Sequence, residues 1–265
     1  MSVVDGVRSP RRDRTLRLVA PVAVGLLGLA VWQLLVGVVG VSAYLLPSPS
    51  EIAAEWTANA GPIAEAAWIT GVNAVLGVLV GSAVGVALAA VAARLRWIDQ
   101  MLAPVVAGLA VVPIVALAPV LNSMFGADSE IGRRTIAAIA SFVPVFLNTL
   151  RGLRQTTPLH RDLMRSYAAT GSQTLRTLTL PTAAPYVLTG LRVASSLAVI
   201  SALVAEYFGG PRGGLGAFIS TSAATSAYAR AWAYVGASIL LGLGLYLVTV
   251  ALERLVTRLL TGGAR

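Results

Sequence analysis

The 265-residue chain is too apolar for a soluble domain: hydrophobic residues make up 57% of it, charged residues only 12%, and its mean hydropathy is +0.80, whereas about a quarter of a soluble domain is charged. Its net charge of +9 comes from arginine alone, and because the arginines flank apolar runs we expect a lipid bilayer and no nucleic acid as partner. The absence of cysteine excludes disulfides and thiolate chemistry, and a single histidine, His160, excludes a histidine-rich metal site.

Apolar runs long enough to cross a membrane predict an all-α, polytopic membrane protein with about six transmembrane helices. The fourth run is the shortest and contains Pro144, which a span tolerates when neighbouring helices cover the freed backbone groups. The first run exceeds the usual core of a signal peptide, so we expect it to remain as a span although Val41-Ser42-Ala43 resembles a cleavage site. The six runs are 18–39, 68–93, 102–121, 135–150, 186–208 and 232–252.

The arginines are divided unequally between the two sides of such a bundle. With six alternating spans, one side holds five arginines in 1–17, two in 94–96, six in 151–192 and three in 253–265. The positive side is cytoplasmic, so we expect cytoplasmic tails at 1–17 and 253–265, an extracytoplasmic loop at 40–67 and a permease core at 68–252. The other side keeps four arginines, of which the adjacent Arg133 and Arg134 are left without an explanation: Arg133, Arg134, Arg212 and Arg230.

Three glycines recur at a spacing of four in the second run, at Gly77, Gly81 and Gly85. Small residues at this spacing let two helices approach closely within lipid. The pattern therefore predicts a tight helix–helix seam. The alternative is coincidence in a chain rich in glycine and alanine.

The chain carries no energy source that its sequence reveals. Ion-coupled carriers keep carboxylates or histidines inside the membrane, but only Glu206 lies in an apolar run, at its outer end. The glycine-rich stretch 209–214 lacks the Gly-Lys-Ser/Thr ending of a phosphate loop, and we interpret it as a tight turn. A transporter of this composition needs an energised partner. The alternatives are a self-contained carrier or channel, which would need a relay or filter in the spans, and a membrane-embedded enzyme, for which catalytic groups are scarce.

The segment between the fourth and fifth spans, 151–185, is polar at its start. Thr157-Pro158 is a typical helix start, with threonine as N-cap and proline at the first position. After it, Leu159, Leu163, Met164 and Tyr167 form an apolar stripe. We expect a break at 170–172, then a second short helix that Pro181 and Pro185 end. Two alternatives stay open: a helix lying among lipid headgroups, or a plug that docks in a groove of a partner.

This segment resembles the cytoplasmic coupling loop of ABC importer permeases. The family signature is Glu-Ala-Ala, three residues, Gly, nine residues and Ile-x-Leu-Pro. Aligned on Leu178-Thr179-Leu180-Pro181, it has Asp162 at the Glu position and Ala168 at the Gly position. An alanine there predicts an ordinary helical φ, so we expect Gly171 to supply the bend instead.

The resemblance extends along most of the chain. Residues 46–51 (Leu-Pro-Ser-Pro-Ser-Glu), 113–119, 125–126 and 144–152 are similar to permeases of the nitrate, sulfonate and taurine group. Within that group, 163–167 and 206–210 are similar to members that handle pyrimidine precursors or flavins.

The resemblance implies the permease subunit of a bacterial cell-membrane importer, not itself an enzyme and without a cofactor of its own. Its implied partners are a second copy of the chain, an ABC ATPase dimer that binds the ATP, and an extracytoplasmic solute-binding protein. The implied solute is a small nitrogen- or sulfur-containing organic molecule or an anion. The ATPase-coupling residues are Arg161, Asp162, Leu163, Met164, Arg165, Tyr167, Ala168, Gly171, Leu178, Leu180 and Pro181.

The candidates for the translocation pathway are polar or aromatic residues near the later spans: Asn122, Asn148, Ser201, Glu206 and Tyr207. The alternative for these groups is mutual hydrogen bonding across helices without contact to a solute. For Glu206 a further alternative is contact with the solute-binding protein, and for Asp162 it is an exposed charge favoured by the helix dipole.

Overall fold

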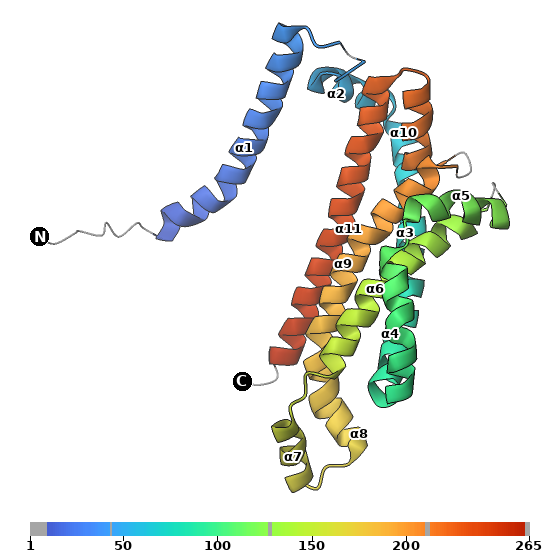
Figure 1. Ribbon diagram of the computed structural model, residues 1–265. Coiled ribbons are helices and arrows are strands. Elements are labelled where there is room, and N and C mark those ends of the chain that lie inside the picture. The colour runs from blue at the N-terminus through green and yellow to red at the C-terminus, as the bar shows by residue number, and fades with distance from the viewer. Residues whose placement is uncertain (1–9, 43, 127–128, 210–212, 263–265) are drawn as a thin grey trace, which may run out of the picture.

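The computed structural model describes residues 10–42, 44–126, 129–209 and 213–262, and in these ranges every regular element is a helix (Figure 1), which confirms the all-α class. In chain order the elements are α1 (Pro10–Val39), α2 (Pro49–Ala58), α3 (Ala60–Arg94), α4 (Arg96–Val111), α5 (Ile114–Phe125), α6 (Ile131–Leu153), α7 (Pro158–Ser166), α8 (Gly171–Thr174), the π-helical turn η1 (Leu175–Thr179), α9 (Leu180–Tyr207), α10 (Leu215–Ala224) and α11 (Tyr228–Gly262). We call the lower end in Figure 1 the α7 end and the upper end the α10 end.

Five of the described helical stretches are long and apolar enough to cross a membrane, and the bent pair α4–α5 makes a sixth if it is counted as one span. The expectation of one continuous third span over 102–121 is wrong, because α4 and α5 meet at an angle of 97°. Proline cannot donate a backbone hydrogen bond and favours an extended residue before it. Accordingly, Val112 is extended and Pro113 caps α5, which turns across the bundle near the α10 end (Figure 1).

The fourth predicted span, whose apolar run is the shortest of the six, lies at the centre of the bundle. Its helix α6 packs along both α3 and α9. The seam with α3 confirms the interpretation of the spaced glycines: a side chain at Gly77 or Gly81 would collide with Ala137 or Ala138 of α6, and one at Gly85 would press on the α6 backbone. These small residues let the backbones of α3 and α6 approach closely, which favours packing within lipid.

The fifth span is longer than expected. Helical structure continues without interruption from Gly171 to Tyr207, so the expectation that Pro181 and Pro185 end a separate short helix is wrong. The π-helical turn η1 directly precedes Pro181, and in it the Leu180 amide donates to Leu175 O, five residues back. A wider turn relieves the clash that a proline ring makes with the carbonyl four residues before it.

The stretch 46–51 forms the start of α2. Ser48 is the N-cap, Pro49 follows at the first helical position, and Glu51 closes a capping box by accepting the Ser48 amide at 2.8 Å. The two hydrogen bonds from Ser48 lower the pKa of the Glu51 carboxyl. The predicted loop 40–67 therefore contains α2 and the start of α3, which begins at Ala60, eight residues before the predicted span.

The first span stands apart from the others. Helix α1 approaches the bundle at the α10 end, where Trp32 meets Trp232 edge to face at 5.6 Å and the Gln33 amide donates to Ser50 Oγ at 3.1 Å (Figure 1). The start of α1 and the end of α11 both point toward the α7 end. Residues 1–9 and 263–265 of the predicted tails, and residue 43 of the cleavage-like motif, lie outside the described residues.

Candidate functional site

The segment between α6 and α9 projects beyond the bundle at the α7 end (Figure 1). As predicted, α7 begins at Thr157, whose side chain accepts the His160 amide, with Pro158 at the first position. Leu159 and Tyr167 are each 76% exposed and Leu163 is 52% exposed, whereas Met164 is half-buried. Exposed apolar side chains of this size at a projecting tip are typical of a contact surface.

The turn between α7 and α8 is made by Ala168. Its φ is +51°, so the expectation of an ordinary helical φ at this position is wrong, and so is the placement of the bend at Gly171, which opens α8. The Ala168 amide donates to Arg165 O at 2.8 Å and the Ala169 amide to Met164 O at 3.0 Å. This pairing is a Schellman motif, which needs a left-handed residue and normally takes glycine.

Polar contacts hold this tip against the bundle. The Arg161 guanidinium donates twice to Thr156 Oγ1, at 3.0 and 3.2 Å. Arg154, which caps α6, forms an ion pair with Asp99 of α4 at 2.8 Å. The first contact ties α7 to the segment that precedes it, and the second ties the end of α6 to α4.

A second polar cluster lies at the α10 end and is built around Glu206, the penultimate residue of α9. Its Oε2 accepts hydrogen bonds from Thr70 Oγ1 at 2.8 Å and from the Gly216 amide at 3.0 Å, and Thr70 Oγ1 accepts the Leu215 amide at 2.8 Å. A carboxylate beside the first amides of α10 is favoured by the helix dipole. Gly214, with φ +88°, passes so close to the Glu206 carboxylate that a side chain there would collide with it.

The cluster continues through the two arginines that the sequence left unexplained. Arg133 is fully buried, and its Nη1 lies 2.9 Å from Glu130 Oε2 and 3.8 Å from Glu206 Oε1. Asn73 Nδ2 donates to Glu130 Oε2 at 2.6 Å, and Arg134 Nε donates to Asn73 Oδ1 at 3.0 Å. Arg133 thus stays on the arginine-poor side because it is neutralised inside the protein.

The predicted pathway residues do not form one group. Glu206 and Tyr207 line a cavity of about 460 Å³ beside α10, and the Asn122 amide donates to Ala205 O next to them at 3.3 Å. Asn148 donates within its own helix, to Pro144 O at 2.8 Å, and Ser201 is buried. No hydrogen bond between described residues connects Asn148 or Ser201 to the Glu206 cluster, and residues 210–212 of the predicted turn lie outside the described ranges.

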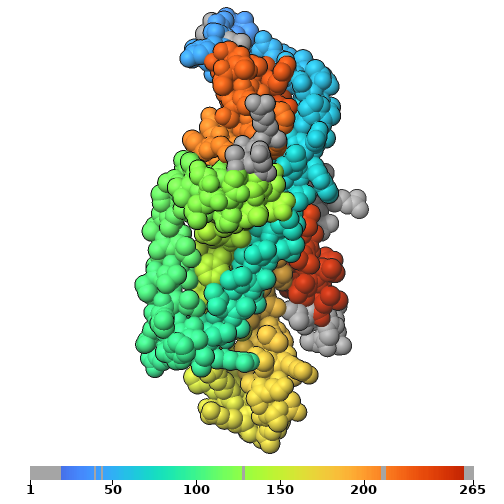
Figure 2. Space-filling model, turned by 90° about the vertical axis from the view of Figure 1, so that its right-hand side faces the viewer, coloured from blue at the N-terminus to red at the C-terminus, as the bar shows by residue number. Residues whose placement is uncertain are grey.

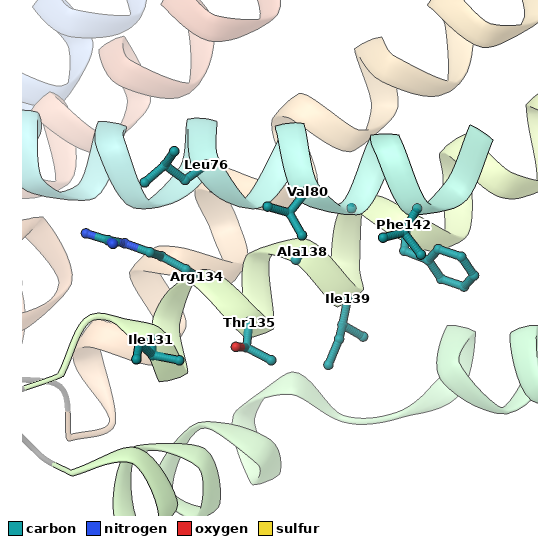
Figure 3. A pocket seen from close by; sticks show the side chains of 10 residues that line it. Leu76, Val80, Ile131, Arg134, Thr135, Ala138, Ile139 and Phe142 are labelled. Atoms are coloured by element: carbon teal, nitrogen blue, oxygen red, sulfur yellow. The ribbon is translucent and has the colours of Figure 1, made fainter. Parts of the chain in front are cut away.

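A groove of about 510 Å³ opens on another face of the molecule, between α3 and α6. Figure 2 shows α6 recessed between α3 and α4, beneath α5. In Figure 3 Arg134 lies at one end of the groove and Phe142 at the other, with aliphatic side chains between them. The described residues contain no group of three or more His, Asp or Glu side chains that could hold a metal ion.

Sequence reasoning missed four of the residues that build these sites, namely Thr70, Asn73, Glu130 and Arg134. One signal was present: two arginines on the side that disfavours them, of which Arg133 is three residues after Glu130, suggest an internal ion pair. Asn73 is also the one amide side chain within the second apolar run. The rest of the groove had no signal, because apart from Arg134 its lining residues are ordinary residues of membrane helices.

A helical membrane bundle with a projecting helical tip between its two central helices is the architecture that the resemblance to transport permeases predicted. Comparison with known families gives the particular assignment. Residues 77–259, more than half of the chain, match the family described as binding-protein-dependent transport system inner membrane component. The chain belongs to this family. It is therefore a multi-pass permease component of an ABC import system, a class of system that works with an ATPase and a binding protein.

Curated relatives agree with this assignment. The chain is 32% identical over 257 residues to the riboflavin transport system permease protein RibX of Chloroflexus aurantiacus, covering 95% of this chain and 94% of that protein. It is 29% identical over 205 residues to the formylaminopyrimidine transport permease protein ThiX of Halalkalibacterium halodurans, covering 76% and 80%. It is also 29% identical over 187 residues to the putative aliphatic sulfonates transport permease protein SsuC of Bacillus subtilis, covering 70% and 67%.

Proposed function

We propose that the chain forms the solute pathway of an ABC importer and receives its ATPase at the tip formed by α7 and α8. The observation that carries the proposal is the projection of α7 beyond the bundle with exposed Leu159, Leu163 and Tyr167. A helix lying among headgroups would turn such side chains into the membrane. A helix beyond the bundle end instead offers them to a groove on a protein. Asp162 and Arg165, paired at 3.1 Å on the same helix, add polar contacts at the rim.

The proposed orientation puts the α7 end in the cytoplasm. The arginine-rich segments 94–96 and 151–192 gather at that end, and the positive-inside rule favours it. Both termini are then cytoplasmic, because α1 begins and α11 ends toward the α7 end. The α10 end, with α2, α10 and the Glu206 cluster, faces the extracytoplasmic solute-binding protein.

In the proposed cycle two copies of the chain enclose the pathway and two ATPase subunits bind the ATP. Closure of the ATPase dimer pushes the α7–α8 tips, and the continuous helix from Gly171 to Tyr207 carries this displacement to the α10 end as a rigid body. The contact between Arg154 and Asp99 passes the same push to α4. The pathway then alternates between outward and inward openings.

The names of the relatives support a class of solute and no single compound. They specify riboflavin, formylaminopyrimidine and aliphatic sulfonates. We propose a small nitrogen- or sulfur-containing organic solute or anion. The identity with RibX extends over nearly the full length of both chains, which favours a heterocyclic molecule over an inorganic ion.

Leu163→Asp tests the docking proposal. The leucine is exposed, so the chain folds with aspartate there, but a charge placed in an apolar contact costs several kcal/mol. We expect the variant to lose co-purification with its co-expressed cognate ATPase, and Met164→Asp to do the same. Gln155→Asp, which adds the same charge at an exposed position before α7, keeps the complex. Complex formation unchanged in both Leu163→Asp and Met164→Asp would contradict docking at this tip.

A further inference from the structure

We infer that the groove between α3 and α6 binds a small organic anion through Arg134, which holds the anionic group while the groove holds an apolar body. The inference rests on the proposed function as a permease and adds to it a ligand-contacting residue and a chemical class of solute. Five aspects of the structure carry it: the charge of Arg134, its fixed orientation, its position, and the lining and size of the groove.

No carboxylate among the described residues forms an ion pair with Arg134. Both carboxylates of the α10-end cluster, Glu130 and Glu206, lie against Arg133. Within the described part of the chain, Arg134 makes one hydrogen bond, from Nε to Asn73 Oδ1, and no ion pair. A cation in a membrane-spanning helix is costly and marks a functional site by default. The two Nη groups of Arg134 remain as a fork of donors that fits a carboxylate, sulfonate or phosphate.

The orientation of the guanidinium is fixed by Asn73. Because the Asn73 amide nitrogen donates to Glu130 at 2.6 Å, its oxygen is left to face Arg134. The hydrogen bond to Nε then holds the plane of the guanidinium and leaves its outer edge for a ligand. Asn73 and Glu130 are thus positioning residues, and no contact between them and the ligand is required.

The position of Arg134 makes it the polar end of an otherwise apolar groove. Figure 3 shows its side chain at one end of the lining residues, beside Leu76 and Ile131, with Ile139 and Phe142 toward the other end. Thr135 adds one hydroxyl. From Ile131 to Phe142 the groove follows about 16 Å of α6, since these residues are eleven helical steps apart.

The lining and size of the groove suit an amphipathic solute. Its volume of about 510 Å³ falls within the range of small-molecule sites, which are mostly apolar with a few placed polar groups. Val80 and Val84 on α3 are 56% and 46% exposed although they face this hollow. A suitable solute has one anionic group and an apolar body, either a few rings or a short alkyl chain. Its anionic group binds Arg134 while its apolar body covers these valine side chains.

Equilibrium dialysis on the purified full-length chain in phosphatidylcholine nanodiscs tests the inference, with empty nanodiscs subtracted. The probes are naphthalene-2-sulfonate and its uncharged analogue naphthalene-2-sulfonamide. Arg134→Gln should weaken sulfonate binding by about tenfold to a hundredfold, the usual effect of hydrogen bonds to a charged group. Sulfonamide binding should change by less than about twofold, since the apolar groove is intact. Arg134→Lys, which keeps the charge without the fork, should lie between.

Two matched variants locate the site. Arg96→Gln removes an arginine at the start of α4, outside the groove, and should leave both probes unaffected. Val80→Trp fills the exposed groove wall and should abolish the binding of both probes. Persistent sulfonate binding in Arg134→Gln, or of either probe in Val80→Trp, would overturn the inference.

Two other outcomes are distinguishable: lipid fills the groove, or protein closes it. If phosphatidylglycerol in the nanodiscs displaces the sulfonate, and native mass spectrometry finds that lipid retained in an Arg134-dependent manner, the groove is a lipid site and the inference is overturned. If the wild-type chain binds neither probe, protein closes the groove and the inference fails as well. Because these measurements need no ATPase, they are independent of the co-purification result for Leu163→Asp.

Discussion

The two ends of the α6–α9 pair break the usual arrangement of a membrane protein in opposite ways. At the α10 end, charged side chains are inside: Arg133 and Glu206 are almost completely buried. At the α7 end, apolar side chains are outside: Leu159 and Tyr167 stand in the open on a projecting helix. The first arrangement is stable within the chain because each of these charges lies beside an opposite charge. The second becomes favourable only when another surface covers it, which is why we assign docking to that end.

The largest expected effect comes from removing the buried charge at the α10 end. Arg133→Met leaves Glu130 and Glu206 close together without their shared cation. Breaking a buried ion pair on one side costs about 3–5 kcal/mol. We expect a large fall in the midpoint of thermal unfolding of the purified chain, followed by tryptophan fluorescence in detergent.

The matched control for Arg133→Met is an ion pair of the same chemistry at the α7 end. Asp162→Asn breaks the pair with Arg165, in which both side chains are well exposed, and an exposed pair contributes about 0.5 kcal/mol or less. Adding Glu206→Gln to Arg133→Met should restore part of the loss by removing the unpaired charge. Equal effects of Arg133→Met and Asp162→Asn would contradict the distinction between the two ends.

An intermediate effect is expected at the α3–α6 seam that connects the ends. In Gly81→Ala the new methyl group meets Ala138 O and Ser141, and overpacking of this kind costs about 1–3 kcal/mol. The unfolding midpoint should fall. In Gly244→Ala, on α11 with no atom within 4 Å of the added carbon, alanine should stabilise the helix by about 0.5–1 kcal/mol. A fall of equal size in both variants would argue against the seam.

The sequence was sufficient for most of the membrane-spanning helices, because a membrane span is set by the composition of a stretch and needs no knowledge of its neighbours, but the short helices α2 and α10 were not predicted. It also placed the start of α7, which depends on Thr157 and Pro158 alone. The breaks were harder. A proline only restricts the backbone, so Pro113 bends the third span by 97° while Pro181 lies in a continuous helix behind a π-helical turn. Which outcome occurs depends on packing that a linear pattern does not contain.

The sites divide in the same way. The tip residues are local in sequence and were predicted as a group. The α10-end cluster joins residues up to 145 positions apart, such as Thr70 and Leu215, so the sequence could only mark its members singly. Arg133 and Arg134 are neighbours with different surroundings, one neutralised and one facing the groove. Helical geometry turns adjacent side chains by about 100°, and only the packing decides what each one meets.

The smallest expected effect concerns a left-handed alanine at the α7 end, Ala168 at φ +51°. The α10 end has left-handed residues of both kinds, such as Gly214 at φ +88° and Ser226 at φ +60°. A left-handed backbone costs a residue with a side chain roughly 1–2 kcal/mol. Glycine avoids this cost, but part of the gain is lost because glycine makes the unfolded chain more flexible. Ala168→Gly should therefore stabilise the tip by about 1 kcal/mol, seen as slower hydrogen exchange of the α7 amides. Ala169→Gly, one residue on and without a positive φ, relieves no such strain and should speed exchange. Slower exchange in both variants, or in neither, would show that Ala168 holds no strain and that the turn owes its shape to its hydrogen bonds to Met164 and Arg165 alone.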